Sequence, residues 1–251
     1  MQELKSHYPV LEQAKAHTHI DAAKYDAMYK QSIEQPDVFW AEQAEEFLDW
    51  YKPWDSVSDV DLKSAKINWF TGGKLNVSYN CIDRHLATKA NDTAIIWEGD
   101  DPSEDKNITY QELHDHVCRF ANLLKARGVK KGDRVCIYMP MIPEIGYAML
   151  ACARIGAVHS VVFGGFSTEA IRSRIIDADC KVVITSDESL RGGRVIPLKV
   201  NVKKKLPNFR LFVSQKLWML KTLSLSYIPQ ALQALQKVFC ILVVAIYFMP
   251  Q

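Results

Sequence analysis

The sequence predicts an α/β protein: an N-terminal helical entry segment is followed by an incomplete βαβ sheet subdomain, and an irregular apolar tail comes last. Apolar residues recur at helical spacing between positions 20 and 52, whereas apolar runs alternate with helical patterns from Thr93 onward. Strands separated by helices are typical of parallel βαβ units in an open sheet. A change of pattern after Val202 marks the tail. We therefore expect three segments, residues 1–75, 76–202 and 203–251.

The entry segment is expected to hold two helices separated by Pro36. Apolar residues lie on one stripe before this proline and on a second stripe after it, from Trp40 to Leu48. Both stripes are interpreted as packing surfaces. Residues 52–73 are rich in turn formers, and we expect them to connect the entry segment to a helix over 76–88.

Four apolar runs predict the strands of the sheet, and signals at helix ends place the helices between them. Thr109 and Glu112 form a capping box at the start of the first of these helices, which ends at Gly128. Pro143 opens the second helix and Gly156 closes it. The expected strands are 94–97, 134–138, 158–163 and 181–185, and the third helix is 167–178.

The composition argues against several classes of protein. The 31 basic and 29 acidic residues are spread along the chain and leave a net charge of +2, so no field suited to nucleic acid or to a membrane surface is expected. The 6 cysteines lack paired spacing, which argues against disulfides and zinc sites. No secretory signal is visible, and the apolar stretch 238–249 is shorter than the ~20 residues of a membrane-spanning helix. A cytoplasmic protein is favoured over a tail-anchored membrane protein.

A strand, two glycines and a helix start follow one another at Phe163, Gly164, Gly165 and Ser167. Glycines at the carboxyl end of a strand let a ligand approach the backbone closely, and a helix N-terminus offers N–H groups to an anion. Ligands of open α/β sheets bind at that edge. The alternative interpretation is a plain tight turn without a ligand.

Two arginines, Arg191 and Arg194, flank a glycine pair shortly after the last expected strand. Guanidinium groups on a flexible glycine hinge could converge on a phosphate, to which arginine makes charge-assisted and often bidentate contacts. The alternative is a solvent-exposed basic loop. Together with the Gly-Gly turn, the arginine pair suggests a nucleotide-like ligand that carries phosphate.

Other polar residues are interpreted as structural. Residues 76–85 are expected to form an N-capped helix in which Asp83 and Arg84 make local polar contacts. His114 and His116 lie two apart on a helix and face different sides, so they make a poor metal pair, and His159 is interpreted as a core histidine. We expect no Ser-His-Asp triad and no pair of catalytic carboxylates.

Three segments, residues 76–85, 156–167 and 186–194, together resemble the acetyl-CoA synthetases, the AMP-forming acetate–CoA ligases of the adenylate-forming superfamily. The resemblance extends over about residues 8–202. Trp69, Phe70 and the segment 79–86 are also similar to propionyl-CoA synthetases, which leaves a propionate–CoA ligase as an alternative. The Arg-Gly-Gly-Arg sequence favours the acetate enzymes.

The resemblance implies an enzyme in which acetate attacks ATP to give acetyl-adenylate and pyrophosphate, and the CoA thiol then displaces AMP, with Mg²⁺ in the full-length family. It implies that Arg191 and Arg194 hold the 3′-phosphate of CoA, while Phe163, Gly164 and Gly165 bracket its adenine. These roles concern binding, and no catalytic residue is assigned. The expected partners are small-molecule substrates. The alternative is a non-catalytic module that binds CoA or a nucleotide.

The tail, residues 203–251, departs from the family pattern after the basic triplet that begins at Lys203. Codons for residues 227–238 can be chosen so that a shifted frame encodes Y-T-S-G-S-T-G-T-P-K-G-V, which resembles the phosphate loop of the superfamily. We therefore interpret the tail as out-of-phase translation. The ATP contacts and the adenylating lysine of the family would lie beyond this point, so the chain alone is expected not to make acetyl-CoA.

Overall fold

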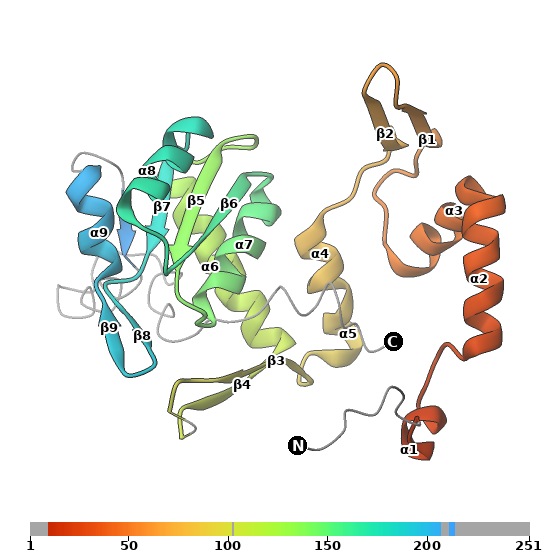
Figure 1. The fold of residues 1–251 in the computed structure, drawn as a ribbon, viewed down its shortest axis with the longest axis horizontal. Coiled ribbons are helices and arrows are strands. Elements are labelled where there is room, and N and C mark those ends of the chain that lie inside the picture. The colour runs from red at the N-terminus through yellow and green to blue at the C-terminus, as the bar shows by residue number, and fades with distance from the viewer. Residues whose placement is uncertain (1–9, 102, 207–210, 214–251) are drawn as a thin grey trace, which may run out of the picture. The chain divides into compact units, whose positions relative to one another are not determined.

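The computed structural model describes residues 10–101, 103–206 and 211–213 (Figure 1). The chain divides into two compact units, which meet in the sequence at Leu75 and Asn76. Most of the predicted tail, with its membrane-like stretch and its proposed shift of frame, lies outside the described residues. Among the residues described, no helix is long and apolar enough to cross a membrane.

The first unit contains helices on both sides of Pro36, as predicted. Asp21 caps the N-terminus of one helix by accepting a hydrogen bond from the Lys24 backbone N–H at 2.8 Å, and Pro36 opens the next, where its missing N–H costs nothing. The elements of this unit are α1 (Glu12–Ala16), α2 (Ala22–Glu34), α3 (Pro36–Phe47), β1 (Ser56–Asp61) and β2 (Lys66–Thr71).

Residues 52–73 form an antiparallel hairpin, β1 with β2, and not only the turn-rich connection predicted from the sequence. The strands are mostly exposed, so their polar composition resembles that of a loop. An aromatic cluster of Trp50, Trp54 and Phe70, with ring centroids 5.0 to 5.6 Å apart, lies at one end of the hairpin. Packing between residues distant in sequence therefore stabilises strands that local pattern does not predict.

The second unit is built on a sheet of four parallel strands in the order β10-β7-β5-β6 (Figure 1). This arrangement confirms the predicted α/β fold with parallel βαβ units. The strands of the sheet are β5 (Arg134–Met139), β6 (Val158–Phe163), β7 (Val182–Thr185) and β10 (Leu211–Val213). Its longer helices are α6 (Tyr110–Ala126), α7 (Glu144–Ile155), α8 (Thr168–Asp177) and α9 (Leu198–Lys205).

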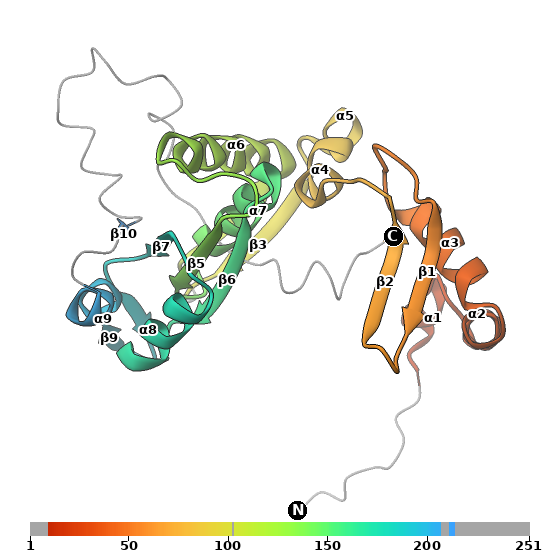
Figure 2. The same cartoon turned by 90° about the horizontal axis from the view of Figure 1, so that it is seen from above.

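Helices cover both faces of this sheet (Figure 2). On one face Val135 and Ile137 of β5 belong to the core cluster that includes residues of α6 and α7. On the other face Cys136 and Tyr138 belong to a second cluster with residues of α8 and α9. Successive residues of β5 thus point to opposite faces, and both faces are apolar, as expected for a strand buried between two helical layers.

Local signals place the helix ends where the sequence predicts them. The backbone N–H of Glu112 donates to Thr109 Oγ1 at 3.2 Å, and the Thr109 N–H donates to Glu112 Oε2 at 2.9 Å, which completes the capping box of α6. Gly128 and Gly156 follow α6 and α7 in the left-handed conformation, with φ of 83° and 73°. In both cases the next residue donates back to a carbonyl of the last turn, as in a Schellman motif.

Two predictions near the start of this unit are wrong in detail. The helix expected over 76–88 is broken into α4 (Val77–Cys81), the 3₁₀ helix η1 (Asp83–His85) and α5 (Leu86–Lys89), because the backbone of the fully buried Ile82 leaves the helical region. The first expected strand, β3 (Thr93–Glu98), pairs with β4 (Asp105–Thr109) in a separate antiparallel sheet.

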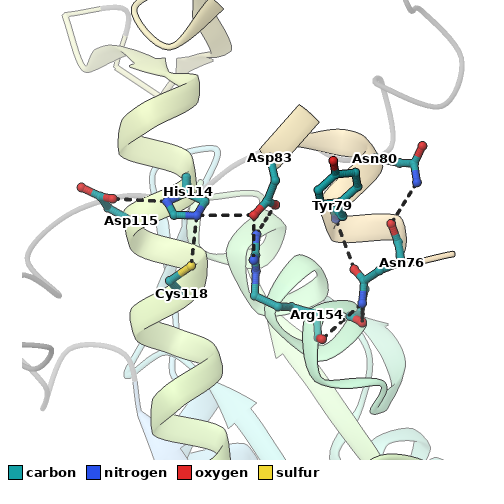
Figure 3. Close-up of polar contacts among 9 residues, drawn as sticks. Asn76, Tyr79, Asn80, Asp83, His114, Asp115, Cys118 and Arg154 are labelled. Atoms are coloured by element: carbon teal, nitrogen blue, oxygen red, sulfur yellow. Dashed lines mark hydrogen bonds and ion pairs between the residues drawn. The ribbon is translucent and has the colours of Figure 1, made fainter. Parts of the chain in front are cut away.

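Asp83 reaches across the unit and does not make the local contacts expected of it. Its carboxylate accepts two hydrogen bonds from the guanidinium of Arg154 on α7, from Nη1 at 3.0 Å and from Nη2 at 2.5 Å (Figure 3). Asn76 caps α4 as predicted, and its side-chain amide also donates to the carbonyls of Ala153 and Arg154. The prediction of local contacts holds for Arg84, which contacts His85.

The half-buried His116 stacks on Tyr147 with ring centroids 4.8 Å apart. Burial, with a smaller contribution from Arg119, lowers the pKa of His116 from 6.5 to about 4. Between pH 6.5 and 4 the unfolded chain therefore binds a proton that the folded chain does not. We expect the contribution of His116 to the free energy of unfolding to be constant above pH 6.5. As the pH falls from 6.5 to 4, the free energy of unfolding should decrease by about 2 kcal/mol.

Urea unfolding at a series of pH values measures this effect. His116→Phe keeps a ring against Tyr147 but cannot take up a proton, so the variant should lose this part of the pH dependence. An unchanged pH profile in the variant would contradict the assignment to His116.

Candidate functional site

The candidate site begins at the carboxyl end of β6, where the chain turns sharply into α8. The Phe166 N–H donates to the Phe163 carbonyl at 3.0 Å, which closes a β-turn with Gly164 and Gly165 at its centre. Ser167 then caps α8 by accepting a hydrogen bond from the Ala170 N–H at 3.3 Å. The predicted succession of strand, glycines and helix N-cap is present.

Tyr138 of β5 holds this turn in place through its hydroxyl group. Its hydroxyl is shared between the carbonyl oxygens of Gly164, at 3.1 Å, and Phe166, at 3.2 Å. The side chain is fully buried, and burial raises the pKa of Tyr138, so the phenol remains a hydrogen-bond donor. The turn is thus attached to the centre of the sheet, a connection that no sequence motif predicts.

Both glycines of the turn have close neighbours, of different kinds. A Cβ at Gly164 would lie 3.2 Å from the backbone carbonyl oxygen of Met139, and a Cβ at Gly165 would lie 2.6 Å from the Phe163 ring and 3.1 Å from Arg191. The neighbour of Gly164 is main chain inside the protein, whereas the neighbours of Gly165 are side chains at the surface. The Phe163 and Arg191 side chains can move aside at low cost, whereas the Met139 carbonyl cannot.

We therefore expect Gly164→Ala to lower the free energy of unfolding by about 1–3 kcal/mol, and Gly165→Ala by less than about 1 kcal/mol. Urea unfolding of the two variants side by side measures the difference. Equal losses would show that the carbonyl of Met139 does not restrict position 164.

Two exposed aromatic rings and two guanidinium groups meet at this turn. Phe163 and Phe166 are 46% and 44% exposed, and their rings are perpendicular with centroids 6.1 Å apart. Arg191 lies over the Phe163 ring at 5.0 Å, and Arg174 of α8 lies over the Phe166 ring at 4.8 Å. Such cation–π contacts hold positive charge beside the rings. The contribution of Arg174 could not be predicted, because its place in the helix sequence carries no distinguishing signal.

The arginine pair lies on an antiparallel hairpin and not on a flexible loop. Strands β8 (Ser189–Arg191) and β9 (Arg194–Ile196) are joined by Gly192 and Gly193. These glycines have φ of 54° and 72°, as a two-residue type I′ turn requires. The Gly192 N–H also donates to Asp100 Oδ2 at 2.9 Å.

Arg191 and Arg194 are directly opposite each other in the register of this hairpin. Residues opposite in an antiparallel pair project on the same face, and like charges there repel. A bound anion relieves this repulsion, so the hairpin geometry is suited to phosphate. The structure brings together Arg191, Phe163 and Gly165 and places Arg194 across the turn from Arg191.

The remaining polar residues do not join this site. His159 is exposed on β6, so its interpretation as a core histidine is wrong. The described residues include no group of three or more histidine, cysteine, aspartate or glutamate side chains able to hold a metal ion.

Comparison with known proteins identifies the family. A model described as AMP-binding enzyme matches residues 82–225, and one described as acetyl-coenzyme A synthetase N-terminus matches residues 25–81. The acetyl-coenzyme A synthetase of Saccharophagus degradans is 68% identical over 197 residues, which cover 78% of this chain and 30% of that protein. Acetyl-coenzyme A synthetase 2 of Pseudomonas aeruginosa is 61% identical over 199 residues, 79% of this chain and 31% of that protein.

A solved structure agrees with these matches. The acetoacetyl-CoA synthetase from Streptomyces lividans is 27% identical and superposes with a TM-score of 0.68 over 80% of this chain and 32% of its own.

The α/β fold and the family match make this chain a member of the AMP-binding enzyme family. Within that family it is similar to the N-terminal part of acetyl-coenzyme A synthetases, which confirms the resemblance found in the sequence motifs. The chain spans about 30% of the length of these relatives.

Proposed function

We propose that this chain forms the CoA-binding part of an AMP-forming acetate–CoA ligase, which makes acetyl-CoA from acetate, ATP and CoA through acetyl-adenylate. The observation that carries this proposal is the convergence of Arg191 with the exposed Phe163 turn, with Arg194 opposite Arg191 in the hairpin. A ligand with one planar ring system and a phosphate nearby fits both features. The similarity to acetyl-coenzyme A synthetases supports acetate as the acid.

In this proposal Arg191 and Arg194 hold the 3′-phosphate of CoA, and Phe163, Gly164 and Gly165 bracket its adenine. The phosphate replaces arginine–arginine repulsion with charge-assisted hydrogen bonds. The adenine lies against the exposed ring of Phe163. Gly164 and Gly165 have no side chains, so they do not prevent the adenine from approaching the turn.

We assign no described residue to the Mg²⁺ ion of the full-length family. The cysteines Cys81, Cys118, Cys136, Cys152 and Cys180 are all free, as is usual in a reducing compartment. This supports a cytoplasmic location.

Titration of the chain with CoA and with dephospho-CoA, which lacks only the 3′-phosphate, tests the proposal. Isothermal titration calorimetry should give an affinity for CoA at least about 100-fold higher, because the 3′-phosphate is proposed to make charge-assisted contacts with both arginines and each contact contributes about 1.5–3 kcal/mol. Equal affinities, or no binding of either compound, would overturn the assignment of these residues to CoA.

A further inference from the structure

A cavity of about 650 Å³ lies at the C-terminal ends of α6 and α7. Its wall includes Lys130 and Lys131, which precede β5, and Ile155, which precedes β6. The cavity is therefore near the amino ends of the parallel strands, whereas the Phe163 turn is at a carboxyl end. It shares no residue with the proposed CoA site.

The wall of this cavity is basic. Lys125, Lys130, Lys131 and Arg154 contribute to it, and none of its lining residues is acidic. The stem of Lys131 packs over Gly156, where a Cβ would lie 2.9 Å from its Cγ. Asp83 takes two of the five N–H donors of Arg154, and the Nε–H has no acceptor among the described residues. Cations around a concave surface raise the local concentration of anions.

A thiol in the same wall lies beside an imidazole nitrogen. The sulfur of Cys118 lies 3.4 Å from Nε2 of His114, one turn earlier on α6, and Nδ1 of His114 lies 3.4 Å from Asp115 Oδ1 (Figure 3). Asp83 Oδ1 is also near, 3.5 Å from the same Nε2. In the tautomer that carries its proton on Nδ1, directed at Asp115, the Nε2 lone pair faces the thiol, and the proposal below uses this tautomer. Sequence patterns did not predict this succession of thiol, imidazole and carboxylate.

The other described cysteines lack this setting. Cys136, Cys152 and Cys180 are buried, and burial raises the pKa of Cys136 and of Cys152 to about 12. Cys81 is partly exposed like Cys118 but does not line the cavity. Burial also raises the pKa of Cys118, although Arg154 opposes the rise. A thiol that is protonated at neutral pH reacts through a neighbouring base, and His114 is in position to be that base.

We propose that Cys118 is a modification site at which small disulfides carrying carboxylates form a mixed disulfide, drawn into the cavity by its cations and activated by His114. The thiol proton passes to Nε2 of His114, and the sulfur attacks one sulfur of the disulfide. The new S–S bond forms as the old one breaks, and the second half of the reagent leaves as a thiolate that takes up the proton. One disulfide and one thiol are thus consumed, and one mixed disulfide and one thiol are formed.

The first test uses the unaltered chain with two disulfides of opposite charge, 3,3′-dithiodipropionate and cystamine. Peptide mass spectrometry measures the second-order rate of modification at Cys118 and at Cys81, and each rate is divided by that of the same reagent with N-acetylcysteine. At low ionic strength the anionic reagent should be about tenfold or more faster at Cys118. Cys81 should show a smaller preference. A lack of preference at Cys118, or no modification there, would overturn the proposal.

Variants separate the two parts of the proposal. Changing Lys125, Lys130 and Lys131 together to glutamine should slow the anionic reagent at Cys118 and leave the neutral bis(2-hydroxyethyl) disulfide unaffected. His114→Gln should slow all three reagents about tenfold or more at Cys118, but not at Cys81. Circular dichroism establishes that each variant is folded. If His114→Gln leaves the rates unchanged, His114 is not the base and the proposal fails.

Discussion

Replacing both Arg191 and Arg194 by alanine will weaken the binding of CoA at least about 100-fold. Each arginine is proposed to donate charge-assisted hydrogen bonds to the 3′-phosphate, and each such contact contributes about 1.5–3 kcal/mol, or a factor of ten or more. Calorimetric titration of the double variant measures the loss. The hairpin itself should not be destabilised, because the substitution removes two like charges that are opposite each other in the register.

Dephospho-CoA provides the control for this prediction. Its affinity should be nearly the same for the unaltered chain and for the double variant, because it has no 3′-phosphate that the two arginines could contact. Arg172→Ala is a matched control on the protein side, since this arginine is exposed on α8 and pairs with Glu169. If CoA and dephospho-CoA lose affinity equally, Arg191 acts through its contact with the Phe163 ring and not through phosphate.

The second large effect is expected on stability. Asp83→Ala should lower the free energy of unfolding by about 3 kcal/mol, because it leaves the guanidinium of Arg154 without its bidentate partner. The side chains of Asp83 and Arg154 are only 19% and 21% exposed, so water cannot fully replace the lost carboxylate. Urea unfolding monitored by circular dichroism measures this change. Asp115→Ala is the matched control: its side chain is 43% exposed, and it should cost less than about 1 kcal/mol.

A double variant distinguishes loss of the pair from loss of packing. In Asp83→Leu with Arg154→Leu, both charges are replaced by apolar side chains, which often restores the stability lost when only one partner of a buried pair is removed. We expect the double variant to be more stable than Asp83→Ala. A double variant as unstable as the single one would show that the contact between η1 and α7 requires the ion pair.

Sequence reasoning succeeded where a structural feature is encoded by neighbouring residues. Residues close together in the sequence determine the capping box at Thr109, the helix ends at Gly128 and Gly156, and strand β6. It failed where distant residues decide the outcome. Asp83 meets Arg154, a residue 71 positions later, and the β1–β2 hairpin is built from exposed strands whose composition resembles that of a loop.

The same distinction applies to the candidate site. The Gly-Gly turn after Phe163 and the Arg-Gly-Gly-Arg segment could each be singled out, because a glycine pair next to a strand usually marks a tight turn. Their proximity could not be derived from spacing, since the contact between Arg191 and Phe163 depends on how β8 returns past the end of β6. The contact of Tyr138 with the turn, 26 positions away at Gly164, could not be predicted for the same reason.

The shared hydrogen bond of Tyr138 links the turn proposed to bind CoA to the folding of the sheet. The phenol belongs to the central strand and lies in the core cluster that includes Leu198 and Val202 of α9. A substitution in that helix can therefore displace a surface turn that it does not touch. If the turn binds CoA as proposed, the affinity should depend on interior packing on the α8 and α9 side. A screen for variants with altered affinity is then expected to recover residues that no solvent molecule reaches.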